Sequence, residues 1–305
     1  MSIWNPYSGR HRLSMMPLRV PDPGLRRPGH EWQRALLALL VVVVAVVVTA
    51  AGAAAPRGRA FDRQQGGTWA THDTLDTGAF QFCRLVFWQA PDGDGDGWGV
   101  DFPRADENLS TRLSELTKAP VSVEETGQPA HLLVRLGQPE LFRCPFVMMT
   151  EPGGAYFDEA EASALRDYLL KGGFLWADDF WGEYAWQSWE RQLRKALPSQ
   201  AYPIVDLRTD HAIFHLLMSV PRIPQIPNIG FWLGTGRTSE RGPASAVPHV
   251  RAILDGRDRI MVLMTHNTDF GDAFEEEAVS HAYFERFSVP GYAFGVNVLL
   301  YEMTH

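Results

Sequence analysis

Two adjacent carboxylates, Asp178 and Asp179, stand where an apolar segment, residues 174–177, ends. That segment has the pattern of a buried strand, and a helical pattern over residues 158–171 leads into it through two glycines. Ligands bind at the carboxyl ends of strands in open α/β sheets. Carboxylates there can coordinate a metal ion or act as general acid and base. A structural interpretation is also open, in which a strand-end aspartate accepts backbone hydrogen bonds from a loop.

A second polar group follows the apolar strand pattern over residues 259–265. His266 with Asp269 could form an oriented base, or a mixed carboxylate–imidazole site with the two aspartates above. The alternative is a solvated loop, with Asp269 in an Asx turn and Asp272 as a helix cap. Because both groups follow predicted strands, we expect one shared ligand site at one edge of the sheet. Its predicted members are Asp178, Asp179, Trp181, Glu183, His266, Asp269 and Asp272, of which Asp178, Asp179, His266 and Asp269 are the catalytic candidates.

Two weaker patterns suggest a divalent metal, although no cofactor is assigned. His211 and His215 have the i, i+4 spacing that places two rings on one face of a helix, but no zincin motif surrounds them. Asp92, Asp94 and Asp96 imitate the start of a calcium loop, yet Pro103 occupies the position of the bidentate glutamate. Asp101 and Asp106 lie nearby, so a calcium site and a flexible acidic loop are both open.

The elements that must position these residues alternate between strand and helix from residue 80 onward. Strand patterns cover residues 83–88, 121–123, 145–150, 174–177 and 259–265, and helical patterns cover residues 108–118, 158–171, 185–196 and 290–305. This alternation predicts a doubly wound, mostly parallel α/β sheet. The segment 198–248 is rich in proline and glycine, and we expect it to form a long excursion over one edge of that sheet.

The N-terminal part has a different composition. Residues 35–55 carry no charge and are long enough to form one transmembrane helix, which we favour over a cleaved signal peptide. Six arginines against two acids give residues 1–34 a charge of +4, which places this segment in the cytoplasm and the remainder outside it. Residues 56–79 are predicted to be a linker and residues 80–305 the main domain.

The charge and the cysteine content limit which partners and metals the protein can bind. Subtracting +4 from the total of −8 leaves −12 for residues 35–305, which opposes binding to nucleic acid. Cys83 and Cys144 are too few for a disulfide framework and lack metal-site spacing. They can form one disulfide in an oxidising compartment or remain as two buried thiols.

Several blocks in order resemble the DUF4159 family over residues 80–305. They are FRCPF at 142–146, LRDYLLKGGFLWADDFWG at 165–182, DHAIFH at 210–215, PQIP at 224–227, THNTD at 265–269, GVN at 295–297 and YEMTH at 301–305. The resemblance implies a flavodoxin-like fold of the class I glutamine amidotransferase type, often in bacterial membrane proteins. It implies no activity. Glutaminase chemistry needs a cysteine on the turn after a central strand, and residues 177–182 contain none, so we expect that chemistry to be absent.

Together these patterns predict a membrane-anchored, extracytoplasmic domain that binds a ligand or partner without catalysis. The expected partners are the membrane, through residues 35–55, and an envelope protein or carbohydrate. The alternative is a hydrolase that acts on carbohydrate or cell-envelope material through Asp178, Asp179, His266 and Asp269, with or without a metal.

Overall fold

An eight-stranded sheet forms the centre of the domain in the computed structural model, which describes residues 68–69 and 78–305. Six neighbouring strands are parallel, and the last two join the edge in antiparallel orientation. In spatial order the strands are β1 (Thr68–Trp69), β4 (His131–Val134), β2 (Phe82–Leu85), β5 (Phe146–Thr150), β7 (Phe174–Phe180), β10 (Ile260–His266), β9 (His249–Leu254) and β8 (Ile204–Asp206). The predicted mixed α/β class with a mostly parallel sheet is therefore confirmed.

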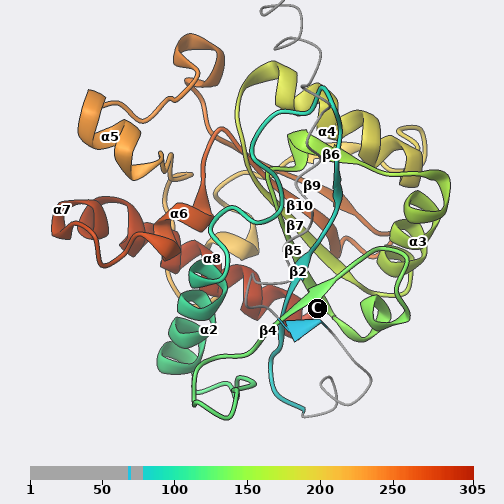
Figure 1. Ribbon diagram of the computed structural model, residues 1–305, viewed down its shortest axis with the longest axis horizontal. Coiled ribbons are helices and arrows are strands. Elements are labelled where there is room, and N and C mark those ends of the chain that lie inside the picture. The colour runs from blue at the N-terminus through green and yellow to red at the C-terminus, as the bar shows by residue number, and fades with distance from the viewer. Residues whose placement is uncertain (1–67, 70–77) are drawn as a thin grey trace, which may run out of the picture. The chain divides into compact units, whose positions relative to one another are not determined.

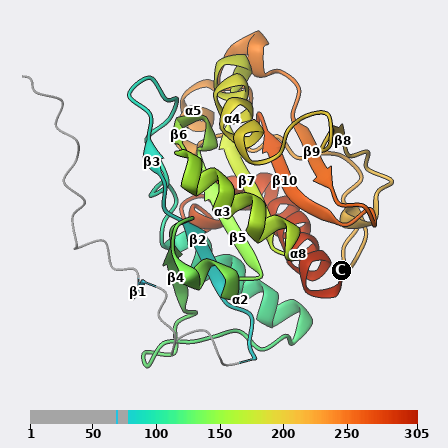
Figure 2. The same cartoon turned by 90° about the vertical axis from the view of Figure 1, so that its right-hand side faces the viewer.

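Helices cover both faces of the sheet, as Figures 1 and 2 show. One layer contains α2 (Arg104–Thr117), α6 (Phe270–Glu275) and α8 (Val289–Thr304), and the other contains α3 (Glu159–Leu170) and α4 (Gly182–Ala196). Two separate apolar clusters, one against each layer, make up the core. The shorter helices α5 (Ile229–Thr235) and α7 (His281–Tyr283) lie outside these layers.

Strand β7 shows how the sequence produces this arrangement. Phe174 and Trp176 pack into the α2/α8 cluster, while Leu175 and Ala177 pack into the α3/α4 cluster, because side chains alternate along a strand. All seven residues of β7 are buried, as expected for a central strand covered on both faces. Gly172 turns the chain from α3 into β7 with a φ of 111°, which is a conformation that glycine adopts without strain.

Cys83 and Cys144 form a disulfide with their Cα atoms 6.1 Å apart. Cys83 lies in β2, and Cys144 lies two residues before β5, which is the neighbouring strand. Of the two open interpretations, paired cysteines and buried thiols, the structure contains the first.

The predicted pattern lacked β4 and β9 of the main sheet, and also β3 (Trp88–Gln89) and β6 (Ala155–Tyr156), which form a separate two-stranded sheet. The excursion 198–248 contributes β8, which pairs with β9 at the sheet edge. The predicted strand 121–123 makes only isolated bridges, from Val121 to Phe80 and from Val123 to Pro129. Within the predicted linker, Thr68–Trp69 pairs with β4 as the short strand β1. Residues 1–34 and the predicted transmembrane helix 35–55 lie outside the described residues. Among the residues that are described, no helix has the length and apolar character needed to cross a membrane.

Candidate functional site

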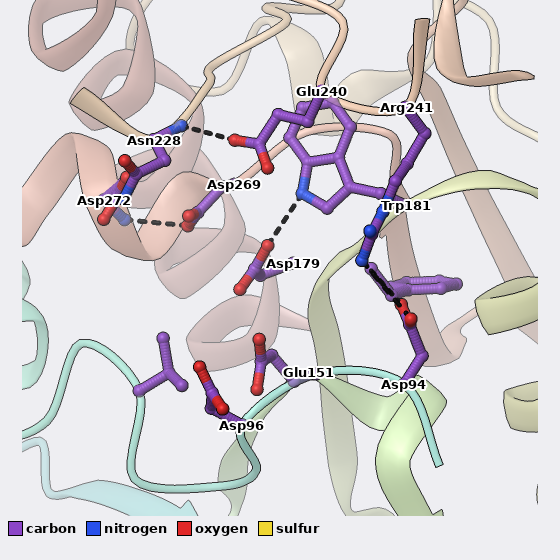
Figure 3. Close-up of a pocket in the computed structure, with 13 residues that line it drawn as sticks. Asp94, Asp96, Glu151, Asp179, Trp181, Asn228, Glu240, Arg241, Asp269 and Asp272 are labelled. Atoms are coloured by element: carbon purple, nitrogen blue, oxygen red, sulfur yellow. Dashed lines mark hydrogen bonds and ion pairs between the residues drawn. The ribbon is translucent and has the colours of Figure 1, made fainter. Parts of the chain in front are cut away.

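An acidic cavity of about 230 Å³ lies where the strands of the parallel sheet end (Figure 3). Its walls come from the loop between β2 and α2, the turn after β5, the end of β7, the excursion 198–248 around α5, and the segment after β10. The lining residues are Asp94, Gly95, Asp96, Val100, Glu151, Asp179, Phe180, Trp181, Asn228, Glu240, Arg241, Asp269 and Asp272. The predicted location at the carboxyl edge of the sheet thus contains a pocket, and most of its polar lining is carboxylate.

The two adjacent aspartates of β7 have different environments. Asp178 is fully buried and does not line the cavity. Its Oδ1 accepts a short hydrogen bond from the Thr265 hydroxyl, and its Oδ2 accepts from the backbone N–H groups of Phe270 at 2.8 Å and Gly271 at 3.1 Å. Asp178 therefore fixes the first turn of α6, which matches the structural interpretation of a strand-end aspartate.

Asp179 lines the cavity because its backbone leaves the regular strand conformation. Its φ of 57° is in the left-handed region, and its carboxylate accepts a hydrogen bond of 2.9 Å from Trp181 Nε1. Figure 3 shows this carboxylate directed toward those of the other acids. Trp181 also lines the pocket but is only 6% exposed, so little of its ring is available for stacking on a ligand.

Asp269 and Asp272 enter the pocket from the start of α6. Asp269 is the helix cap and accepts a 2.8 Å hydrogen bond from the Asp272 backbone N–H. Asp272 accepts a backbone hydrogen bond from Ile229, but its Oδ2 is buried without a hydrogen-bond partner. The helix cap is therefore Asp269 and not Asp272, which was the predicted cap; Asp272 lies within α6 and keeps one carboxylate oxygen without a donor.

Asp101 does not itself line the cavity but lies against the acids that do, and the sequence patterns named it only as a neighbour of the 92–97 loop. It precedes α2, is 5% exposed, and neither of its carboxylate oxygens has a hydrogen-bond partner. A Cβ atom at Gly271 would lie 2.1 Å from its Oδ2, so a glycine at that position permits the close approach. One oxygen each from Asp101, Asp179 and Asp269 lie within 4.8 Å of one another. We call these three residues the aspartate triad.

Burial and mutual repulsion raise the pKa of every member of the aspartate triad well above the ordinary range. For Asp101 the causes are burial and the nearby charge of Asp272; for Asp179 they are burial and Asp101; for Asp269 they are burial and Asp179. Burial together with Glu276 and Glu275 raises the pKa of Asp272 to about 8. Like charges this close disfavour simultaneous ionisation unless a cation joins them.

The side chains of the described residues supply little positive charge to this group. Arg84 is fully buried nearby, but its guanidinium is bound to Asp106 and to the backbone of Trp98 and Val100. Arg241 lines the cavity and is paired with Asp94 at 3.3 Å. Neither arginine forms an ion pair with the aspartate triad among the contacts of residues 78–305.

The rim of the pocket brings in part of the predicted calcium-like loop. Asp94 and Asp96 line the cavity, whereas the backbone carbonyl of Asp92 accepts a hydrogen bond from Tyr184. Glu151, in the turn after β5, accepts a hydrogen bond from the Gly97 backbone N–H, and burial raises its pKa to about 7. The loop after β2 is thereby held against the turn after β5.

His266 and Glu183, both predicted members of the site, do not line the cavity. The His266 ring packs beside Phe180 and Trp186, with Nε2 3.0 Å from the Gly182 carbonyl and Nδ1 3.3 Å from Arg251. Burial lowers its pKa to about 4. Glu183 is exposed on α4 and accepts a hydrogen bond from Gln187. Of the predicted members, Asp179, Trp181, Asp269 and Asp272 therefore line the cavity, and Asp178, Glu183 and His266 do not.

The predicted histidine pair has a different local structure from the one its spacing required. Residues Ala212–Phe214 form a single 3₁₀ turn instead of an α-helix. His211 Nδ1 accepts a hydrogen bond from the Ile213 backbone N–H as the cap of that turn, and His215 Nε2 contacts the Thr209 carbonyl. The argument that an α-helix places both rings on one face is wrong here, because a 3₁₀ turn rotates successive residues differently.

Fold and site together define a mixed α/β protein with a mostly parallel sheet and a carboxylate-rich pocket at the carboxyl edge of its parallel strands. The model of the family described as "Domain of unknown function (DUF4159)" matches residues 86–303. The chain belongs to this family, which confirms the resemblance seen in the sequence blocks. No curated protein matches the chain.

Proposed function

We propose that this protein binds a divalent, oxygen-preferring cation, with Asp101, Asp179 and Asp269 as ligands and calcium as the preferred ion. The carrying observation is Asp101, a buried carboxylate with two unpartnered oxygens that faces two further carboxylates. An isolated buried carboxylate is strongly unfavourable, and buried charges are normally paired or coordinate metals.

The number of carboxylates favours calcium over magnesium. Ca²⁺ takes about 6–8 oxygen ligands, many of them carboxylates, whereas Mg²⁺ is usually held by one or two carboxylates and keeps several waters. The triad oxygens lie within 4.8 Å of one another. Glu151, Asp96 and water could supply further ligands from the rim of the cavity.

A binding role is favoured over a hydrolytic one. The alternative hydrolase requires His266 beside the acids, but this ring faces Gly182 and Arg251 and is outside the cavity lining. We propose that the bound cation holds an envelope protein or carbohydrate through the open side of the pocket. We also propose that glutaminase chemistry is absent, since Asp178 and Asp179 occupy the turn and both cysteines are paired with each other.

Two further features support the fold family and location that we propose. The five strands β4, β2, β5, β7 and β10 follow the chain order 2-1-3-4-5, which is the order of flavodoxin-like folds. The Cys83–Cys144 disulfide favours an oxidising compartment, in line with a membrane-anchored, extracytoplasmic domain.

The test is isothermal titration of calcium into the full-length, calcium-depleted protein in detergent. We expect saturable binding that is lost in Asp179→Asn and Asp269→Asn. The matched control is Asp167→Asn, which removes an exposed carboxylate on α3 and should bind calcium as the wild type does. Absence of saturable heat up to millimolar calcium in the wild type, or equal binding by Asp269→Asn, would overturn the proposal.

A further inference from the structure

We infer that the buried acidic group at the pocket binds two cations, with Asp101 as the ligand that both share. The second site consists of Asp101, Asp272 and Glu275. One oxygen from each of these residues lies within 4.8 Å of the others, as in the aspartate triad. The inference rests on the proposed function and adds a second ion to the same centre.

The hydrogen-bond state of the residues supports a second ion. Asp101 has two oxygens, both buried and both without a hydrogen-bond partner, whereas a single ion needs only one of them. Asp272 Oδ2 is also buried without a partner, and Asp272 is 3% exposed. Since Asp272 is not in the aspartate triad, an ion held by that triad leaves this second orphaned oxygen unexplained.

Charge leads to the same conclusion. The two groups together contain five carboxylates, from Asp101, Asp179, Asp269, Asp272 and Glu275. One divalent ion would leave three formal negative charges uncompensated, while two would leave one. Carboxylates that bridge two ions hold them about 3.5–4 Å apart in known two-metal sites.

Gly271 is the structural feature that makes sharing possible. It lies between Asp269 and Asp272 on α6, and Asp101 Oδ2 occupies the space that a Cβ atom would fill, at 2.1 Å. The Asp101 carboxylate can therefore reach acids from both ends of the first turn of α6. Asp178 fixes the same turn through the backbone N–H groups of Phe270 and Gly271.

The experiment is metal analysis of the full-length protein after equilibrium dialysis against calcium, with the bound ions counted per chain. We expect two ions in the wild type, one in Glu275→Gln and none in Asp101→Asn. Glu276→Gln is the matched control, because it removes the same charge from the adjacent residue, which is in neither group. It should retain two ions.

The outcomes separate this inference from the proposed function. One ion in both the wild type and Glu275→Gln overturns the second site and leaves the first intact. No bound ion in the wild type overturns both. Circular dichroism of each variant guards against a loss of binding through unfolding. A folded Glu275→Gln variant that keeps two ions also contradicts the assignment of Glu275.

Discussion

Two groups of buried charges lie close together in this domain and are accommodated in opposite ways. Arg84 and Asp106 are fully buried, and Arg84 forms hydrogen bonds with both oxygens of Asp106, with two backbone carbonyls and with Thr150. The acids around Asp101 have buried oxygens without partners. The first group is complete within the protein, while the second has no such partners among the described residues, which is why we propose that a cation completes it.

The adjacent residues Asp178 and Asp179 repeat this contrast on a single strand. Asp178 accepts three hydrogen bonds, from Thr265, Phe270 and Gly271, which join the end of β7 to β10 and to the first turn of α6. Asp179 faces the cavity, where burial and the neighbouring acids raise its pKa. Most buried polar groups in proteins are hydrogen-bonded, so the unpartnered oxygens of Asp101 and Asp272 beside Asp179 support the ligand site that we propose.

The largest effect is expected from breaking the complete pair. Arg84→Met should lower the free energy of unfolding by about 3–5 kcal/mol, because it leaves Asp106 buried and unpaired. Urea denaturation of the full-length protein in calcium-free buffer measures this effect. The double variant Arg84→Met/Asp106→Leu should recover much of the loss. A loss below about 1 kcal/mol in the single variant would show that the pair does not require both members.

His266 illustrates a third solution, in which a buried group stays neutral. Its folded pKa of about 4 lies below the unfolded value of 6.5, so the unfolded chain binds the proton first. Stability linked to His266 is complete above pH 6.5 and is lost as the pH falls from 6.5 to 4, by about 3 kcal/mol.

Because other acids titrate in the same range, the comparison must be with His266→Gln. As the pH falls from 7 to 4, the free energy of unfolding of the wild type should decrease by about 3 kcal/mol more than that of His266→Gln. A difference that does not change with pH would mean that the imidazole protonates freely in the folded state.

The sequence predicted this edge of the sheet well, because strand ends and polar residues are local signals. Asp179, Trp181, Asp269 and Asp272 were placed together from the strand patterns alone. The predicted carboxylate–imidazole site of His266 with Asp178 is not formed in the structure. Asp178 bonds to Thr265 on the α2/α8 side, whereas His266 packs with Phe180, which belongs to the α3/α4 cluster.

Other elements depend on contacts distant in sequence. Asp101 has no local pattern, since its position follows from the loop between β2 and α2 and from the absence of a side chain at Gly271. Strand β4 has only four residues, and β9 places the half-buried Arg251 among apolar residues at the sheet edge. Both were too short or too mixed to be recognised by periodicity.

An intermediate effect is expected from the two neighbouring aspartates on β7. Asp178→Asn should lower the free energy of unfolding by about 1–3 kcal/mol in calcium-free buffer, since the amide nitrogen cannot accept a hydrogen bond. Asp179→Asn should cost less than Asp178→Asn under the same conditions. Urea denaturation of both variants gives the comparison. Equal losses would remove the distinction between a structural and a ligand-binding aspartate.

The smallest effect, and one of opposite sign, is expected from Asp101→Asn. Without calcium this change should raise the free energy of unfolding by about 1 kcal/mol, because it removes a repelling charge and adds a donor for the adjacent carboxylates. Thermal denaturation with and without calcium measures it. The variant should gain no stability from calcium. A clear loss of stability without calcium would show that Asp101 is satisfied within the protein.

Crystals of the full-length protein grown with calcium, followed by an anomalous difference map at long wavelength, test the central claim most directly. We predict a peak within about 2.6 Å of oxygens of Asp101, Asp179 and Asp269. A map without a peak at these residues, together with Asp101 hydrogen-bonded to a protonated neighbouring carboxyl group, would contradict the cation site.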